Sequence, residues 1–352
     1  MLFLIFLAYL VGIFVLLVAV AFVADLALRS KGYRGPVSTN FDGTKFLNMK
    51  VGVPMAPKQS FGAIMRWMLS RPKNVWEDRA VEPVVPAARV EGSELIATLV
   101  NHATVLIQTQ GMNILSDPIY SKRASPFTFA GPRRFTAPGI AFDDLPKIDA
   151  VLISHNHYDH LDLATLKRLM KRDAPRIFAP LGNEAFLKSH DIPATELDWW
   201  QAEQLSDVVS LTCVPAQHFS ARALSDRNKT LWSGYAITTP AGSVYFAGDT
   251  GYGPFVEQIA ERFPQGFRLG LLPIGAFRPE WFMREVHISP EEAFRIQQQL
   301  NIQDVLAIHF GTFKLADDGQ DESAQHVYAL AAKLPASRRF VALPNGSSVR
   351  VP

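Results

Sequence analysis

Apolar residues along the chain fall into short runs of strand length, separated by polar turns and a few amphipathic segments. From Glu91 to the C-terminus, runs rich in β-branched and aromatic residues predict strands, and glycine-containing turns join some of them as hairpins. The expected strands lie at 95–109 and 113–115, joined through Gln110-Gly111, at 151–154, at 232–239 and 243–247, joined through Pro240-Ala241-Gly242, and at 305–309.

Helices are expected between the later strands. Ser289-Pro290-Glu291-Glu292 combines a serine cap, a proline in the first turn and a glutamate three residues after the cap, which is typical of a helix start. Two other helices are expected from Asp162 to about Lys171 and near 323–333. Hairpins first and helices later fit an αββα sandwich, although the pattern alone also fits a doubly wound α/β sheet.

The first part of the chain has a different pattern. Residues from Leu2 to Ala24 carry no charge, and about twenty apolar residues suffice to cross a hydrocarbon core as a helix. A cleaved signal peptide is the alternative, but no basic residue precedes the apolar run. The sequence therefore predicts a transmembrane anchor at 1–28, a connector and N-terminal extension at 29–90, and the main domain at 91–352.

Basic residues follow the apolar segment. Arg29, Lys31 and Arg34 flank its C-terminal side, so the positive-inside tendency predicts a single-pass membrane protein with its main domain in the cytoplasm. Within the connector, the stretch from Ile64 to Leu69 fits a helix on the membrane surface or one packed on the main domain, and packing is favoured.

Charge and cysteine content narrow the function only slightly. A net charge of +2 over 352 residues provides no strong positive field, which argues against nucleic acid as a partner. Cys213 is the only cysteine, so no internal disulfide is expected. Its apolar surroundings predict a buried thiol.

The densest chemistry lies in the six-residue run His155-Asn156-His157-Tyr158-Asp159-His160, directly behind the strand expected at 151–154. Three imidazoles and a carboxylate on one tight turn can direct ligands at two adjacent points. Zinc prefers these ligands, and iron or manganese bind them less selectively. A polar loop whose histidines cap the next helix is the alternative, and it is uncommon at this density.

Three further polar residues each close an apolar run. They are His218 after 208–214, Asp249 after 244–248 and His309 after 305–308. Taken singly, each is explained equally well as an ordinary strand-end residue. In this order behind the first cluster, they predict one shared metal centre.

This order of residues resembles the metal motif of the metallo-β-lactamase superfamily, in which nearly all enzymes are two-metal hydrolases with an αββα fold. The resemblance implies two Zn²⁺ ions, with Mn²⁺ or Fe as alternatives. It implies that His155, His157 and His218 hold the first metal, that Asp159, His160 and His309 hold the second, and that Asp249 bridges both.

Stretches outside the ligands resemble one branch, the N-acyl-phosphatidylethanolamine-hydrolysing phospholipase D group and its bacterial relatives. The resemblance runs from about Asp42 to the C-terminus. Its motifs are Asn101-His102-Ala103-Thr104, where the group has glycine in the first position, 113–118 with 121–126 and 131–135, and His287-Ile288-Ser289-Pro290-Glu291-Glu292-Ala293.

The resemblance also implies roles near the metals. Asp159 and His287 are the expected catalytic residues: Asp159 accepts a hydrogen bond from the nucleophile, and His287 contacts the phosphate or assists the leaving alcohol. The alternative for His287 is a histidine that only caps the following helix. Asp117 is expected to orient a metal-bound histidine, and His102 either does the same or shapes its turn.

The resemblance thus implies a phospholipase D-type phosphodiesterase. Attack by a metal-activated hydroxide on a glycerophospholipid would release phosphatidic acid and a head-group alcohol such as an N-acylethanolamine. The partners would be the membrane phospholipid and the bilayer around the N-terminal helix, and the resemblance suggests a homodimer. Two alternatives stay open: a lactonase or sugar-phosphate hydrolase of the same superfamily, and a non-catalytic, membrane-tethered metal-binding scaffold.

Overall fold

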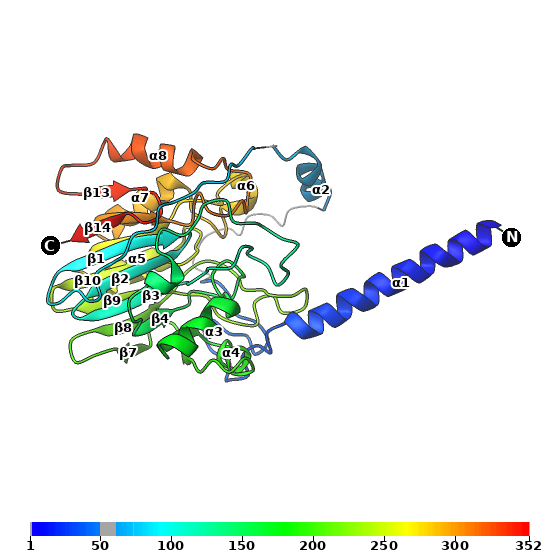
Figure 1. Cartoon of the computed structure of the whole chain (residues 1–352), viewed down its shortest axis with the longest axis horizontal. Coiled ribbons are helices and arrows are strands. Elements are labelled where there is room, and N and C mark those ends of the chain that lie inside the picture. The colour runs from blue at the N-terminus through cyan, green and yellow to red at the C-terminus, as the bar shows by residue number, and fades with distance from the viewer. Residues whose placement is uncertain (1, 50–60, 73, 352) are drawn as a thin grey trace.

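The N-terminal apolar segment forms one long helix that points away from the rest of the molecule (Figure 1). The computed structural model describes residues 2–49, 61–72 and 74–351. Helix α1 (Leu2–Leu28) is followed by α2 (Phe61–Ser70), which lies against the body. Within α1, Tyr9–Leu28 is long and apolar enough to cross a membrane, a description that a membrane anchor and a signal sequence both meet.

Two seven-stranded sheets form the body. In the first sheet the order is β14-β1-β2-β3-β4-β5-β6. The first three strands in sequence pair antiparallel, and β3 to β6 pair parallel. The strands are β1 (Leu95–Asn101), β2 (Thr104–Thr109), β3 (Met112–Ser116), β4 (Ala150–Leu152), β5 (Arg176–Pro180), β6 (Thr195–Leu197) and β14 (Ser348–Val351).

The second sheet has the order β13-β12-β11-β10-β9-β8-β7. Its strands are β7 (Ala202–Gln204), β8 (Ser210–Val214), β9 (Gly234–Thr239), β10 (Gly242–Phe246), β11 (Phe267–Pro273), β12 (Ile302–Ile308) and β13 (Arg339–Val341). Apolar residues from both sheets, such as Leu99 and Phe246, are buried together between them. Burial of this shared apolar face is the main reason that the sheets pack.

Helices cover the outer faces, so the architecture is the αββα sandwich that the sequence predicts (Figure 1). Over the first sheet lie η1 (Phe142–Asp144), α3 (Leu163–Arg172) and α4 (Glu184–Lys188). Over the second lie α5 (Phe255–Arg262), α7 (Pro290–Gln299) and α8 (Glu322–Ala331). The short helix α6 (Glu280–Met283) precedes α7.

Local signals in the sequence set the helix starts. Asp162 caps α3 by accepting a hydrogen bond from the backbone of Ala164, and Ser289 and Glu292 form a complete capping box at α7. One expected element is wrong: residues 95–109 are two strands. The chain turns between them at His102, which has a positive φ of 47°.

The predicted connector is in part packed on the body. Phe41 and Phe46 are buried beside Trp232. In α2, the Trp67 indole donates to the Asp317 carboxylate and its ring lies 4.9 Å from that of Phe282. The packing alternative for this stretch is therefore the one that the structure shows.

Candidate metal centre

Loops that follow strands of both sheets bring the predicted ligands to one place. His155, His157, Asp159 and His160 lie on the loop between β4 and α3. The other three follow strands of the second sheet: His218 follows β8, Asp249 follows β10 and His309 follows β12. All seven are in or beside one buried cluster of imidazoles and carboxylates.

Three imidazoles form the first group. His155 Nε2 lies 2.8 Å from His157 Nδ1, and His218 Nε2 lies 3.3 Å from the same atom. The three ring atoms therefore point at one small volume, as ligands of a single cation do.

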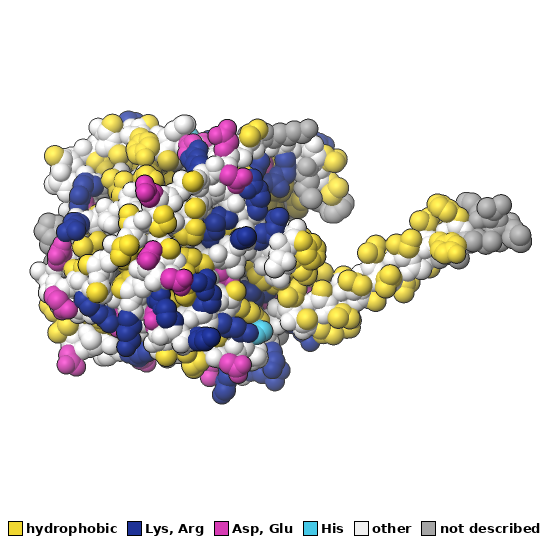
Figure 2. All heavy atoms as spheres, in the orientation of Figure 1, with side chains coloured by type: hydrophobic (Ala, Val, Ile, Leu, Met, Phe, Trp, Pro, Cys, Tyr) yellow, Lys and Arg dark blue, Asp and Glu magenta, His cyan; other side chains and the backbone are white. Residues whose placement is uncertain are grey.

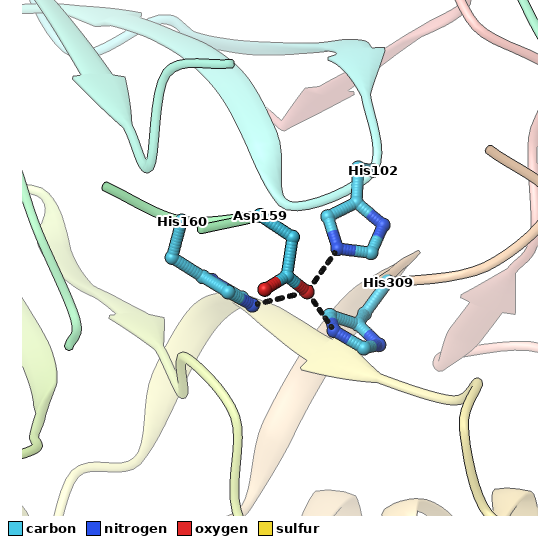
Figure 3. Close-up of side chains that lie close together, drawn as sticks. All are labelled: His102, Asp159, His160 and His309. Atoms are coloured by element: carbon cyan, nitrogen blue, oxygen red, sulfur yellow. Dashed lines mark hydrogen bonds and ion pairs between the residues drawn. The ribbon is translucent and has the colours of Figure 1, made fainter. Parts of the chain in front are cut away.

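The second group surrounds the Asp159 carboxylate (Figure 3). Asp159 Oδ2 lies 3.3 Å from His160 Nε2, 3.4 Å from His309 Nε2 and 3.1 Å from His102 Nε2. His102 thus takes part in the group, although the sequence predicts it as a neighbour of the ligands.

Asp249 faces both groups. Its Oδ2 lies 3.0 Å from His160 Nε2 and 3.0 Å from His309 Nε2. The same oxygen lies 4.0 Å from His155 Nε2 and from His218 Nε2. One carboxylate between two sets of imidazoles is the arrangement that a bridging ligand needs.

The buried atoms of the cluster fit two divalent cations. Within the described part of the chain, His160 Nε2, His309 Nε2 and Asp249 Oδ1 are buried and have no hydrogen-bond partner. The two nitrogens face carboxylate oxygens without forming a hydrogen bond, an arrangement that a cation held between nitrogen and oxygen would satisfy. Nitrogen and carboxylate oxygen together favour zinc-type metals over calcium or magnesium.

Electrostatics point the same way. Burial lowers the pKa of His157 to about 4 and that of His155 and His218 well below the usual 6.5, so these rings are neutral and can coordinate at pH 7. Burial also opposes protonation of His309, but Asp249 and Asp159 outweigh it and raise the pKa of His309 to about 9. The negative charges of these two carboxylates are stabilised by positive charge nearby, which a bound cation would supply.

Asp117 orients two of the rings. Its Oδ2 accepts hydrogen bonds from His160 Nδ1 at 2.6 Å and from the Ser154 hydroxyl at 2.6 Å. Ser154 in turn lies 2.9 Å from His155 Nδ1. With Nδ1 held in each ring, Nε2 is directed at the centre.

The turn at His102 joins the two sheets at the site. The His309 backbone N–H donates to the His102 carbonyl at 2.9 Å. Asn101, which replaces the glycine typical of the related group, does not need positive φ. Its side chain donates to the Ile119 carbonyl and accepts from Arg134.

His287 lies at the edge of the cluster, with Nδ1 3.9 Å from Asp249 Oδ2. Ser289, and not His287, caps α7, so helix capping does not explain this histidine. Burial lowers the pKa of His287 to about 4, and its Nδ1 has no hydrogen-bond partner among residues 2–49, 61–72 and 74–351. It is a neutral imidazole beside the predicted metals.

Sequence reasoning missed three groups that hold the ligands. Asn48 accepts from the His218 backbone N–H at 3.0 Å and donates to its carbonyl at 2.9 Å. The Val286 carbonyl accepts from His218 Nδ1 at 2.8 Å. For Ser154, the sequence predicts only a place at the end of a strand. No local sequence pattern predicts these contacts. Asn48 and Val286 are far from His218 in the sequence, and a serine beside a histidine is too common to indicate a role.

The comparison with protein families defines the class. The model of the beta-lactamase superfamily domain matches residues 112–310, more than half of the chain. The chain therefore belongs to the metallo-β-lactamase superfamily.

Two relatives are more specific. N-acyl-phosphatidylethanolamine-hydrolyzing phospholipase D 1 of Caenorhabditis elegans is 38% identical over 235 residues, which are 63% of this chain and 65% of that protein. The mitochondrial protein of the same name from Saccharomyces cerevisiae is 37% identical over 214 residues, 59% of this chain and 46% of that protein. The chain thus spans less than two thirds of either relative's length.

Solved structures share the fold. Igni18, a metallo hydrolase from the archaeon Ignicoccus hospitalis, superposes with a TM-score of 0.56 at 20% sequence identity, over 74% of this chain and 99% of that one. At this identity the likeness concerns the fold alone.

Proposed function

We propose that this protein is a membrane-anchored, di-zinc phosphodiesterase of phospholipase D type. It would cleave a glycerophospholipid, such as an N-acylated phosphatidylethanolamine, to phosphatidic acid and the head-group alcohol. The observation that carries the proposal is the position of Asp249 Oδ2 between two sets of ligand atoms, combined with similarity to relatives named as such phospholipases.

Seven residues would hold the metals, with Asp249 shared. His155, His157 and His218 would hold one ion, and Asp159, His160 and His309 the other. Two such cations, when bound, supply Lewis acidity and a water of lowered pKa. The chain's own contribution is to fix the ligands through Asp117, Ser154 and Asn48 before substrate arrives.

The remaining residues handle the substrate and protons. Asp159 and His287 are the proposed catalytic residues, and each keeps some side-chain exposure within an otherwise buried cluster. Asp159 would accept a hydrogen bond from the attacking water, and neutral His287 would donate one to the phosphate or to the leaving oxygen. The water oxygen bonds to phosphorus, the bond to the head-group oxygen breaks, and a water proton ends on the alcohol.

A cation beside the site favours an anionic substrate. Phe219 follows His218, and its ring lies 4.4 Å from that of His157. The Arg227 guanidinium lies 4.0 Å from the centroid of the Phe219 ring. Arg227 forms no salt bridge with any residue that the structure describes, so its charge is available to a phosphate.

A lipid substrate agrees with the N-terminal helix. If α1 anchors the protein, the basic residues Arg29, Lys31 and Arg34 favour a catalytic domain on the cytoplasmic side. The enzyme would then meet its substrate in the bilayer to which it is attached.

Turnover of a phospholipid panel, followed by mass spectrometry, tests the proposal. Metal-loaded protein should release phosphatidic acid and a head-group alcohol, and Asp159→Asn should not. Activity confined to lactones or to bis(p-nitrophenyl) phosphate would instead indicate a lactonase or sugar-phosphate hydrolase of the same superfamily. Two bound metals without any turnover would support the non-catalytic scaffold.

A further inference from the structure

A cavity outside the metal centre lies where α1 meets the body. It has a volume of about 430 Å³ and is lined by Ala27 and Leu28 of α1, by the loop 121–128, by Tyr158 and by the start of α3. Among its described lining residues there is none of the seven predicted metal ligands. The cavity is therefore a separate site with no part in the mechanism above.

The end of α1 is fixed to the body beside this cavity. Ser225 donates to the Asp25 carboxylate from its backbone N–H at 2.9 Å and from its hydroxyl at 2.5 Å. The Ser30 N–H donates to Asp226 Oδ2 at 2.8 Å. Asp226 also accepts from the Arg222 N–H at 3.0 Å, so the loop 222–226 holds α1 and Arg222 together.

Arg222 brings a buried positive charge to the cavity wall. Its residue surface is 8% exposed, and its guanidinium lies 4.0 Å from the centroid of the Tyr158 ring. Nη1 donates to the carbonyls of Asn156 and Leu161, whereas Nε has no partner within the described segments. In the same segments, Arg222 has no carboxylate at salt-bridge distance. Asp226 and Asp162, the latter on the cavity wall, stabilise this charge from a distance without forming a salt bridge. An anion in the cavity would give the buried cation a direct counter-ion.

The surroundings of this charge are suited to a lipid. Lys122 stands at the rim, exposed and without an ion-pair partner in the described chain, and Phe127 forms part of the apolar wall. Nearby on the loops, Phe129 is 79% and Leu224 86% exposed. In Figure 2, yellow side chains continue along α1, and dark blue ones lie on the body near its base. Such a mixture is typical of surfaces at the lipid head-group level.

We propose that this cavity binds the phosphate head group of an anionic phospholipid from the bilayer that holds α1. The proposal rests on the membrane anchor of the proposed function. The phosphate would pair with Arg222 and Lys122, and the acyl chains would follow Phe127 and the apolar surface of α1. Because Arg222 also binds the carbonyls of Asn156 and Leu161, the lipid would steady the loop that bears the metal ligands.

Native mass spectrometry of the metal-loaded, full-length protein in detergent tests this site. The Asp159→Asn background prevents turnover, and phosphatidylglycerol is titrated as the probe. Ala27→Trp, which fills the cavity, and Lys122→Glu, which reverses the rim charge, should each weaken retention of one lipid about tenfold or more. The matched controls are Leu26→Trp, exposed on the same turn of α1, and Lys333→Glu, exposed beyond α8.

Three results would overturn the proposal. They are equal phosphatidylglycerol retention in cavity and control variants, equal retention of phosphatidylcholine, and full displacement by millimolar inorganic phosphate, which would identify a free anion as the ligand. Hydrolysis of the phospholipid panel by the wild-type protein is scored separately. Lipid bound at the cavity without hydrolysis would refute only the proposed activity, and hydrolysis without cavity binding would refute only this site.

Discussion

At the scale of single residues, the metal centre depends on buried groups that are held by one another. Asp117 is fully buried, and burial raises the pKa of its carboxyl, yet it accepts three hydrogen bonds from Ser154 and His160. Those bonds set the direction of two imidazoles. His287 differs from these residues because its buried Nδ1, 3.9 Å from Asp249 Oδ2, forms no hydrogen bond within the described structure.

His287→Asn should therefore affect turnover and not metal binding. Loss of a proton donor or acceptor in the transition state typically lowers kcat by about 10²-fold or more. We expect unchanged metal content and a smaller effect on KM, measured by steady-state kinetics and metal analysis. His326→Asn is the matched control, since His326 pairs with Glu291 on the outer helices. Loss of metal in His287→Asn would instead make His287 a ligand.

Asp318 provides a pH test of a buried charge. Burial raises the pKa of Asp318 above its usual 3.8, and its Oδ1 has no partner in the described structure. The folded protein thus binds this proton more tightly than the unfolded chain, and stability falls as pH rises through the window above 3.8. Asp318→Asn removes that loss, so its Tm should exceed the wild-type value by a few degrees at pH 7.

This advantage should shrink as the pH falls toward 3.8 and vanish well below it, where the wild-type carboxyl is protonated in both states. Asp321→Asn is the control of opposite sign. The hydrogen bond from Arg79 lowers the pKa of Asp321, so loss of that carboxylate should reduce Tm at pH 7. If Asp318→Asn changed Tm by the same amount at pH 7 and at low pH, burial of a charged Asp318 carboxylate would not be the cause.

At the scale of elements, the segment around Asn48, which precedes α2, holds the backbone of His218 in place. Asn48 joins the backbone of His218 to the indole of Trp232, whose Nε1 donates to Asn48 Oδ1 at 2.9 Å. The rings of Phe41 and Phe46 are buried in the same cluster as Trp232, with their centroids 4.7 Å apart. The N-terminal extension therefore supports a predicted metal ligand as well as linking α1 to the body.

Asn48→Ala should weaken the metal centre. Three hydrogen bonds are lost at a partly buried position, which costs about 1–3 kcal/mol of stability. Because one of the bonded groups is the backbone of His218, metal affinity should fall about 10- to 100-fold. Competition with a chelating dye measures it. Asn345→Ala, which removes a single bond to the Ala137 carbonyl, should leave metal affinity unchanged.

Much of the arrangement was predictable because the ligands follow strands. Runs such as 305–308 and 244–246 are apolar enough to be recognised, and a polar residue at their end must lie at the edge of a sheet. The break at His102 is marked only by the polar pair Asn101-His102 inside an otherwise apolar run, and the strand predicted at 95–109 wrongly continues through it. The contact of Asn48 with His218 spans 170 residues, and no local pattern encodes such a contact.

At the scale of the whole molecule, the metals should contribute to stability. Their predicted ligands come from the β4–α3 loop and from loops after three strands of the second sheet, so bound cations would join the two sheets. Without them, buried Asp159 and Asp249 depend on protonated imidazoles for neutralisation. The proposed metals would thus link the geometry of the candidate site to the packing of the two sheets.

Chelation should lower Tm accordingly. A ligand present at about 1,000 times its Kd adds about 4 kcal/mol to the free energy of unfolding, and removal forfeits this gain. Thermal unfolding with and without EDTA measures the change, and EDTA already saturated with zinc is the control. An unchanged Tm after verified metal removal would mean that bound metal does not contribute to the stability of the folded protein.

The most direct test of the central claim is hydrolysis of the phospholipid in water enriched in ¹⁸O. Attack of water at phosphorus predicts one ¹⁸O in the phosphate of phosphatidic acid and none in the head-group alcohol, with no product from Asp159→Asn. Label in the alcohol, or in a released fatty acid, would place the cleavage at carbon and contradict a phospholipase D-type reaction at this metal centre.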